Sequence, residues 1–233
     1  MTSSVLDNPA WASLTGPHAR FAERRGQVAR YAVDVAPFLA VSPDSDERVW
    51  AEIAELAGPG AVVSITRGTT PPPHWELVER VPGVQLVDAG VAAAEDAEAV
   101  RLTKDDVPEM LALVERTRPG PFRDRTIELG TYLGIRREGA LVAMAGERLH
   151  PPGWTEISAV CTDPAFRGEG LATRLVLAVA AGIRARGETP FLHAAASNVH
   201  AIRLYESLGF RLRQRPSFSA VRVPAARPVV PHA

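Results

Sequence analysis

Residues 166–173, Phe-Arg-Gly-Glu-Gly-Leu-Ala-Thr, stand between an apolar run at residues 157–161 and a long run rich in Leu, Val and Ala. The first run predicts a strand and the second a helix, so the glycines fall in the turn between them. Such a turn leaves backbone N–H groups unpaired, and the helix dipole adds positive charge at the same place. Because glycine has no side chain, a ligand can approach these N–H groups closely. The stretch therefore predicts a site for a phosphate or pyrophosphate group.

The segment after the turn predicts a helix that ends near Gly187. Beyond it we expect a strand at residues 191–195, a short helix capped by Ser197 or Asn198, and a last strand at residues 218–223. The apolar residues of the first helix recur at four-residue steps and should form one core-facing stripe: Leu171, Leu175, Val179 and Ile183.

The segments before the turn predict a β-meander. Residues 132–135 and 140–145 flank Arg-Arg-Glu-Gly, which is typical of a hairpin turn. Residues 154–161 form the strand that leads into the phosphate turn. A helix through residues 107–114 should precede the meander and end before Arg118.

Composition restricts the class of protein. The chain has 233 residues, with 46% hydrophobic and 23% charged residues and a formal net charge of −1. These values are typical of a globular protein and give no reason to expect a nucleic-acid or membrane partner. The chain has a single cysteine, so we expect no disulfide within it. Its histidines are scattered without ligand spacing, so we expect no structural metal site. Residues 1–9 lack the features of a signal peptide, so we expect a cytoplasmic protein.

Two other phosphate-binding motifs fit the sequence less well. A Rossmann site places its glycines early in an alternating βαβ series, with an acidic residue about 20 positions later. Here the turn follows a meander, late in the chain. A P-loop requires Gly-Lys-Ser/Thr, which is absent. A nucleotide-dependent oxidoreductase is therefore the least favoured class.

The turn resembles the acyl-CoA loop of the GNAT superfamily of N-acetyltransferases, whose pattern is Arg/Gln-x-x-Gly-x-Gly/Ala. A second part of the family pattern follows at the expected distance, and residues 160–164 resemble the end of the family's fourth strand. The resemblance covers about residues 100–223 and is greatest to the branch that contains the C-terminal half of glycine N-acyltransferases. The matching positions are Arg167, Gly170, Ala172, Asn198, Ala201, Tyr205, Leu208, Gly209 and Phe210.

The resemblance implies an α/β (α+β) fold with a mixed, mostly antiparallel central sheet flanked by helices. It places the catalytic domain at residues 95–223, after a small acidic linker. Residues 1–94 are an α/β region compatible with a degenerate copy of the same fold, and no catalytic constellation is visible there. Residues 224–233 are expected to be a flexible Pro/Ala tail.

The resemblance also implies acetyl-CoA as co-substrate, with no metal. Residues of the phosphate turn would hold the pyrophosphate, and the strand before it would pair with the pantetheine arm as an added edge. A backbone N–H of that strand would bind the developing oxyanion. The expected binding residues are Val160, Cys161, Thr162, Arg167, Gly168, Glu169, Gly170, Leu171, Ala172, Thr173, Asn198 and Tyr205.

Tyr205 matches the general acid of the family. Its hydroxyl would hydrogen-bond the leaving thiolate and transfer a proton to it. The alternative is an amphipathic core tyrosine, and for Asn198 the alternative is a helix N-cap. Seven positions separate the two residues, which puts them on one helix face.

Glu156 and Glu147 are the candidates for the base that deprotonates the acceptor amine. Each lies in an otherwise apolar strand, where an acidic residue costs free energy unless it is paired or hydrated. The alternative is a structural ion pair, for Glu147 with Arg148 or Arg136. The residue types favour a buried structural thiol at Cys161.

The sequence therefore predicts an N-acetyltransferase that transfers the acetyl group to a primary amine of a small molecule, amino acid or peptide. The alternative is a non-catalytic domain that binds acyl-CoA. His193 and His200 are expected to be structural or surface residues. We expect a monomer or homodimer, and the sequence does not identify the acceptor.

Overall fold

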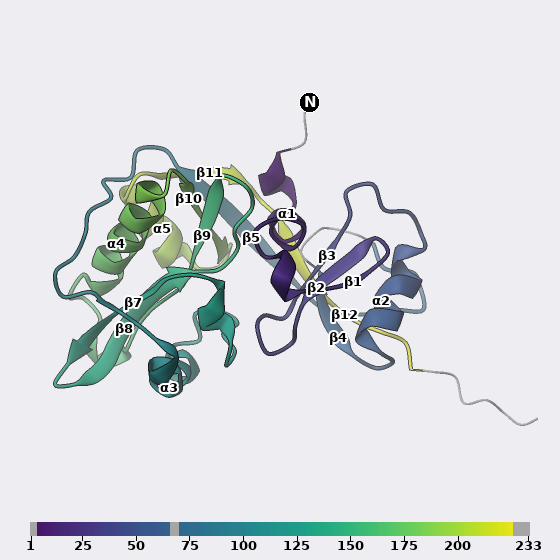
Figure 1. The fold of residues 1–233 in the computed structure, drawn as a ribbon, viewed down its shortest axis with the longest axis horizontal. Coiled ribbons are helices and arrows are strands. Elements are labelled where there is room, and N and C mark those ends of the chain that lie inside the picture. The colour runs from purple at the N-terminus through teal and green to yellow at the C-terminus, as the bar shows by residue number, and fades with distance from the viewer. Residues whose placement is uncertain (1–3, 66–69, 226–233) are drawn as a thin grey trace, which may run out of the picture.

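A computed structural model describes residues 4–65 and 70–225. The strands of these residues form one continuous sheet in the order β1-β2-β3-β4-β12-β5-β10-β9-β8-β7-β6, with β11 also paired to β5 (Figure 1). Only the β3/β4 and β9/β10 pairs are parallel. The expected mixed, mostly antiparallel sheet flanked by helices is confirmed.

The bounds of the strands are β1 (Ala22–Arg25), β2 (Val28–Tyr31), β3 (Phe38–Val41), β4 (Val62–Ile65), β5 (Glu76–Asp88), β6 (Val100–Arg101), β7 (Tyr132–Arg137), β8 (Ala140–Glu147), β9 (Trp154–Thr162), β10 (Thr189–Ala195), β11 (Phe210–Gln214) and β12 (Ser217–Arg222). Those of the α-helices are α1 (Pro9–Leu14), α2 (Val49–Ala57), α3 (Val107–Thr117), α4 (Leu171–Ala185) and α5 (Val199–Ser207).

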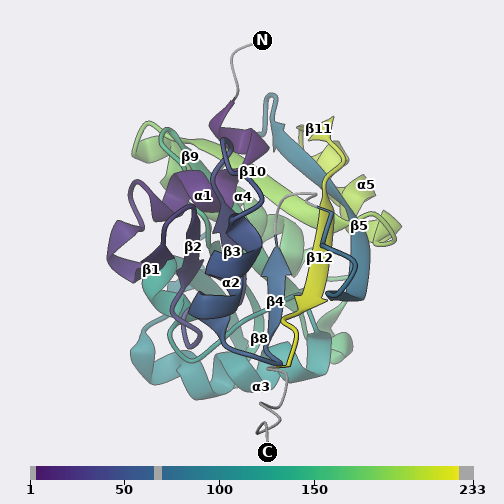
Figure 2. The same ribbon diagram turned by 90° about the vertical axis from the view of Figure 1, so that its right-hand side faces the viewer.

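The long strand β5 joins the two halves of the molecule. Its residues 83–88 pair with β10 and β11, whereas residues 76–82 pair with β12. In turn β12 pairs with β4, so the C-terminal strand lies between β4 and β5 (Figure 2). Pro82, which has no backbone N–H to donate, stands where the neighbour of β5 changes. Four strand pairings, β5 with β10, β11 and β12 and β4 with β12, thus cross the domain boundary that we expected at residue 94.

In the C-terminal half, helices cover both faces of the sheet (Figure 1). Helices α4 and α5 pack on one face, and α3 packs on the other through Met110 and Leu113. The four residues of the expected α4 stripe are all buried, with at most 2% exposed. Helix α3 ends at Thr117, which agrees with the predicted end before Arg118. Arg118 itself adopts the left-handed conformation.

The N-terminal half is built around a smaller core between α2 and strands β2, β3, β4 and β12. Helix α1 lies between the halves, where Leu14 shares a core cluster with Leu149 and Phe191. The mostly apolar residues 84–87 favour a strand by their pattern, and β5 contains them but starts earlier, at Glu76. Most of the tail expected at residues 224–233 lies outside the described residues.

A buried histidine also links the two halves. His18 is 2% exposed; its Nδ1 accepts from the Tyr31 hydroxyl at 3.0 Å and its Nε2–H donates to the Leu129 carbonyl oxygen at 3.2 Å. Burial, and then the neighbouring His150, lower the pKa of His18 to about 3. The unfolded chain has an ordinary histidine pKa near 6.5.

We therefore expect the free energy of unfolding to fall as pH decreases below 6.5. In that range His18 binds a proton in the unfolded state but not in the folded state. From pH 7.5 to 5.5 the loss from His18 should be about 1.4 kcal/mol. Urea denaturation at the two pH values measures it. His18→Gln keeps a donor and an acceptor without the titration, so this variant should lose less. An equal loss in both proteins would contradict the assignment.

Candidate active site

The site begins where strands β9 and β10 part. Their parallel pairing ends at Ile157 and Leu192, although β9 continues to Thr162. On its other side β9 stays paired with β8 through a bulge, in which Ala159 has a left-handed φ of 53°. Residues 158–162 therefore have a neighbouring strand on one side and an open cleft on the other.

This cleft has a volume of about 1300 Å³ and extends from the phosphate turn to the N-terminal half. It brings together most residues of the predicted site. Glu169 of the turn, Glu147 and Glu156 do not line it. The predicted residues that do are Val160, Cys161, Thr162, Arg167, Gly168, Gly170, Leu171, Ala172, Thr173, Asn198 and Tyr205.

The phosphate turn leads directly into α4. Gly168 and Gly170 have φ values of 89° and 74°, the region that favours glycine. No side chain caps α4. In the described part of the chain, the backbone N–H groups of residues 168–173 donate to no protein acceptor. These free donors at a helix start suit a phosphate group.

Two arginines add positive charge to the cleft. The side chains of Arg167 and Arg118 are exposed and line it, and neither forms an ion pair with a described residue. Unpaired guanidinium groups beside free N–H donors suit a ligand with several phosphate groups. The donor set thus fits coenzyme A, whose pyrophosphate the turn would hold.

Helix α5 carries the two polar residues expected to face the ligand. Asn198 caps the helix, since its Oδ1 accepts from the Ala201 N–H at 3.1 Å. Tyr205 packs edge-on against Phe210, with ring centroids 6.2 Å apart, and is 7% exposed. No side chain or backbone group of the described residues forms a hydrogen bond with its hydroxyl. Burial, and then the proximity of Cys161, raise the pKa of Tyr205 to about 12, which keeps this hydroxyl protonated.

Cys161 is a buried thiol. Its side chain packs beneath α3, and burial raises the pKa of Cys161 to about 11. A thiol with this pKa is protonated at neutral pH, and the thiolate is the nucleophilic form. This agrees with the structural interpretation of the residue.

Glu156 belongs to a buried ion pair at the floor of the cleft. Its oxygens accept from Arg148 Nε at 2.9 Å and Nη2 at 2.7 Å, and one also accepts from His193 Nδ1 at 2.7 Å. Burial alone would raise the pKa of Glu156. The charge of Arg148 and the hydrogen bonds from Arg148 and His193 outweigh burial and hold this pKa below its usual range. Such a carboxylate is a weak base.

Glu147 is paired as well, although not with either expected arginine. Its Oε1 accepts from Arg186 Nη2 at 2.9 Å and its Oε2 from the Thr131 N–H at 3.1 Å. Arg136 instead pairs with Asp106 and Glu109. The ion-pair alternative therefore describes what the structure shows for both candidate bases.

His193 lines the cleft, which the sequence did not suggest. Its Nδ1–H donates to Glu156, and its Nε2 accepts from the Gln85 side-chain amide at 3.0 Å. The orientation of this amide is set because its oxygen accepts from Arg213 and its nitrogen donates to the Leu6 carbonyl oxygen. Both ring nitrogens of His193 are therefore engaged by protein groups.

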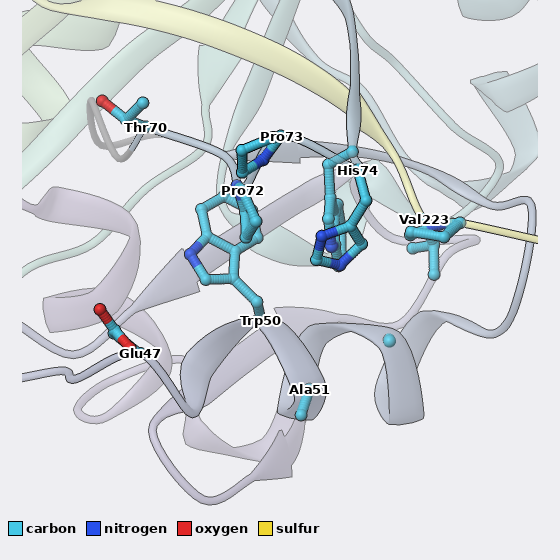
Figure 3. A pocket seen from close by; sticks show the side chains of 11 residues that line it. Glu47, Trp50, Ala51, Thr70, Pro72, Pro73, His74 and Val223 are labelled. Carbon is cyan, nitrogen blue, oxygen red and sulfur yellow. The ribbon is translucent and has the colours of Figure 1, made fainter.

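A second hollow lies in the N-terminal half, with a volume of about 730 Å³. Figure 3 shows the rings of Trp50, Pro72, Pro73 and His74 around it. It contains none of the residues predicted to bind or react. Within residues 4–65 and 70–225, no group of three or more His, Cys, Asp or Glu side chains is placed to hold a metal ion. In the same residues no helix is long and apolar enough to cross a membrane.

Strands β9 and β10 part beside the start of α4, which no side chain caps. This arrangement is expected of the acyltransferase class, and the comparisons with known proteins support it. The family described as FR47-like protein matches residues 132–219. The structure of a GNAT-family protein from Novosphingobium aromaticivorans has 38% sequence identity and a TM-score of 0.86. That match covers 97% of this chain and all of the other. The chain belongs to the GNAT family of acetyltransferases.

Curated relatives match over shorter segments. Mycothiol acetyltransferase of Thermobispora bispora is 34% identical over 157 residues, which is 61% of this chain and 50% of the relative. N-alpha-acetyltransferase RimI of Mycobacterium tuberculosis is 38% identical over 90 residues, or 36% of this chain and 56% of the relative. The chain thus spans about half the length of the curated relatives that it matches.

Proposed function

We propose that the protein is an acetyl-CoA-dependent N-acetyltransferase that acetylates a primary amine of a small molecule, amino acid or peptide by direct attack. The observation that carries the proposal is that Tyr205 lines the same cleft as the phosphate turn, with a hydroxyl that no described residue hydrogen-bonds. A domain that only bound acyl-CoA would have no need of a proton donor there. Residues 95–223 would supply the chemistry, and residues 1–94 would complete the cleft.

Each part of the cleft has a role in this proposal. The free N–H groups of residues 168–173, together with Arg167, would hold the pyrophosphate. The open edge of residues 158–162 would pair with the pantetheine arm, and a backbone N–H there would stabilise the oxyanion of the tetrahedral intermediate. Tyr205 would protonate the departing thiolate, whose conjugate thiol has a pKa near 8.5. We assign neither Glu156 nor Glu147 as proton acceptor, because both are engaged in ion pairs.

The experiment is an assay of thiol release from acetyl-CoA with a panel of amines, including amino acids and peptides, and mass spectrometry of the products. We expect release that depends on the amine, and a product heavier by one acetyl group. Calorimetry should also detect binding of coenzyme A. Binding of coenzyme A without turnover on any amine would overturn the proposal and support the non-catalytic alternative.

A further inference from the structure

The N-terminal half supplies one wall of the cleft. Strands β3, β4 and β5 contribute Phe38, Ser64, Ile65, Glu79 and Val81 to it, and Phe218 comes from β12. The phosphate turn, α5 and the open edge of β9 form the other side. If the coenzyme occupies that second side, the wall from the N-terminal half is left for the acceptor.

Glu79 is the only carboxylate among the described residues that line the cleft. It is exposed, and it forms no hydrogen bond or ion pair with its side chain in the described part of the chain. The charge of Arg148, by contrast, is balanced by Glu156. The negative charge on this wall is therefore available to a ligand.

The surroundings of Glu79 are apolar and aromatic. Val81 lies two positions further along β5 and so on the same face, and the backbone of Phe218 pairs with that of Val81. The Phe218 ring lies over Gly83, where an added Cβ would come within 2.4 Å of the ring. Phe38 completes the aromatic surface, with the Arg148 guanidinium 4.8 Å from its ring centroid.

From this arrangement we infer that Glu79 binds the ammonium group of the acceptor, and that the acceptor is a cationic primary amine with an apolar or aromatic body. The inference rests on the proposed function and assigns to the N-terminal half the recognition of the amine. Glu156 and Glu147 of the catalytic half do not take this role, because both are ion-paired and neither lines the cleft. Both ring nitrogens of His193 are already hydrogen-bonded within the protein.

The proton balance of the reaction gives Glu79 a second role, as the group that accepts a proton from the bound ammonium. The bound ammonium loses one proton to Glu79, which releases it to solvent, and the free amine attacks the thioester carbon. The C–N bond forms, the C–S bond breaks, and Tyr205 gives its proton to sulfur. The second proton lost by the nitrogen restores Tyr205 through solvent. One amide, one thiol and one proton result.

The test compares Glu79→Gln with wild type, using an arylalkylamine, the α-amino acid with the same side chain, and an arylamine that is uncharged at neutral pH. We expect the KM of the arylalkylamine to rise about 10- to 100-fold, which is the effect of losing a charged hydrogen bond. The KM of acetyl-CoA should change less than about twofold, and the uncharged arylamine should be affected little. Calorimetry measures the Kd of each amine for the complex with coenzyme A.

Glu76→Gln is the matched control. Glu76 is three residues away on the same strand, exposed and paired with Arg222, and it does not line the cleft. This variant should behave as wild type. An arylalkylamine Kd that is equal in Glu79→Gln and wild type, or no binding by any amine, would overturn the assignment. Selection of the amino acid over the arylalkylamine would overturn the substrate class. Amine binding that depends on Glu79 without any acetyl transfer would count against the proposed function alone.

Discussion

Tyr205→Phe should lower kcat for acetyl transfer about 10²- to 10³-fold, within the range that a general acid contributes. The change removes only the hydroxyl, which no described residue hydrogen-bonds, and keeps the ring that packs against Phe210. Folding and the KM of acetyl-CoA should therefore be almost unchanged. Steady-state kinetics with a saturating amine measure the effect.

Tyr132→Phe is the matched control for this variant. The Tyr132 hydroxyl is buried without a partner and does not line the cleft. Its removal leaves no donor or acceptor unpaired, so stability should stay the same or increase, and kcat should not change. Full activity in Tyr205→Phe would contradict the role as acid and leave the family membership intact.

Arg148→Met should destabilise the fold by about 3–5 kcal/mol, because it leaves the charge of Glu156 buried without its partner. Glu156 is 0% exposed, and both of its oxygens accept from Arg148. The double variant Arg148→Met with Glu156→Gln should recover most of this loss, since glutamine is neutral and can still accept from His193. Denaturation in guanidinium chloride gives the free energies of unfolding.

Arg222→Met gives the comparison for an exposed pair. Arg222 and Glu76 have side chains 43% and 61% exposed, so the loss of this pair should cost less than about 1 kcal/mol. If Arg148→Met cost no more than Arg222→Met, or if the double variant were no more stable than Arg148→Met, the Arg148–Glu156 pair would not contribute as we infer.

The sequence predicted those parts of the fold that depend on local pattern. The stripe of α4 lies in the core because its four-residue period matches the helix, and Gly168 and Gly170 adopt the left-handed φ that the turn needs. The extent of β5 was missed. Of its residues only 84–87 are mostly apolar, and residues 76–82 pair with β12, which lies about 140 positions later in the sequence.

The sequence predicted those lining residues of the cleft that are close together in the chain. Arg167, Gly168 and Gly170 lie in one turn of the chain, and all three line the cleft. Glu79 could not be found in this way, because it reaches the same cleft as the phosphate turn only through the crossing of β5 between the halves. Nor does an apolar strand show which arginine will pair with the glutamate that it contains, as Glu147 illustrates.

In chain order β4 comes long before its neighbour β12, so β4 leaves the ribosome well ahead of β12 during synthesis. The edge of β4 that faces β12 is therefore unpaired while most of the chain is being made. An open strand edge is a template for pairing with other chains. We therefore expect an incomplete chain that ends before β12 to aggregate more readily than one that contains β12.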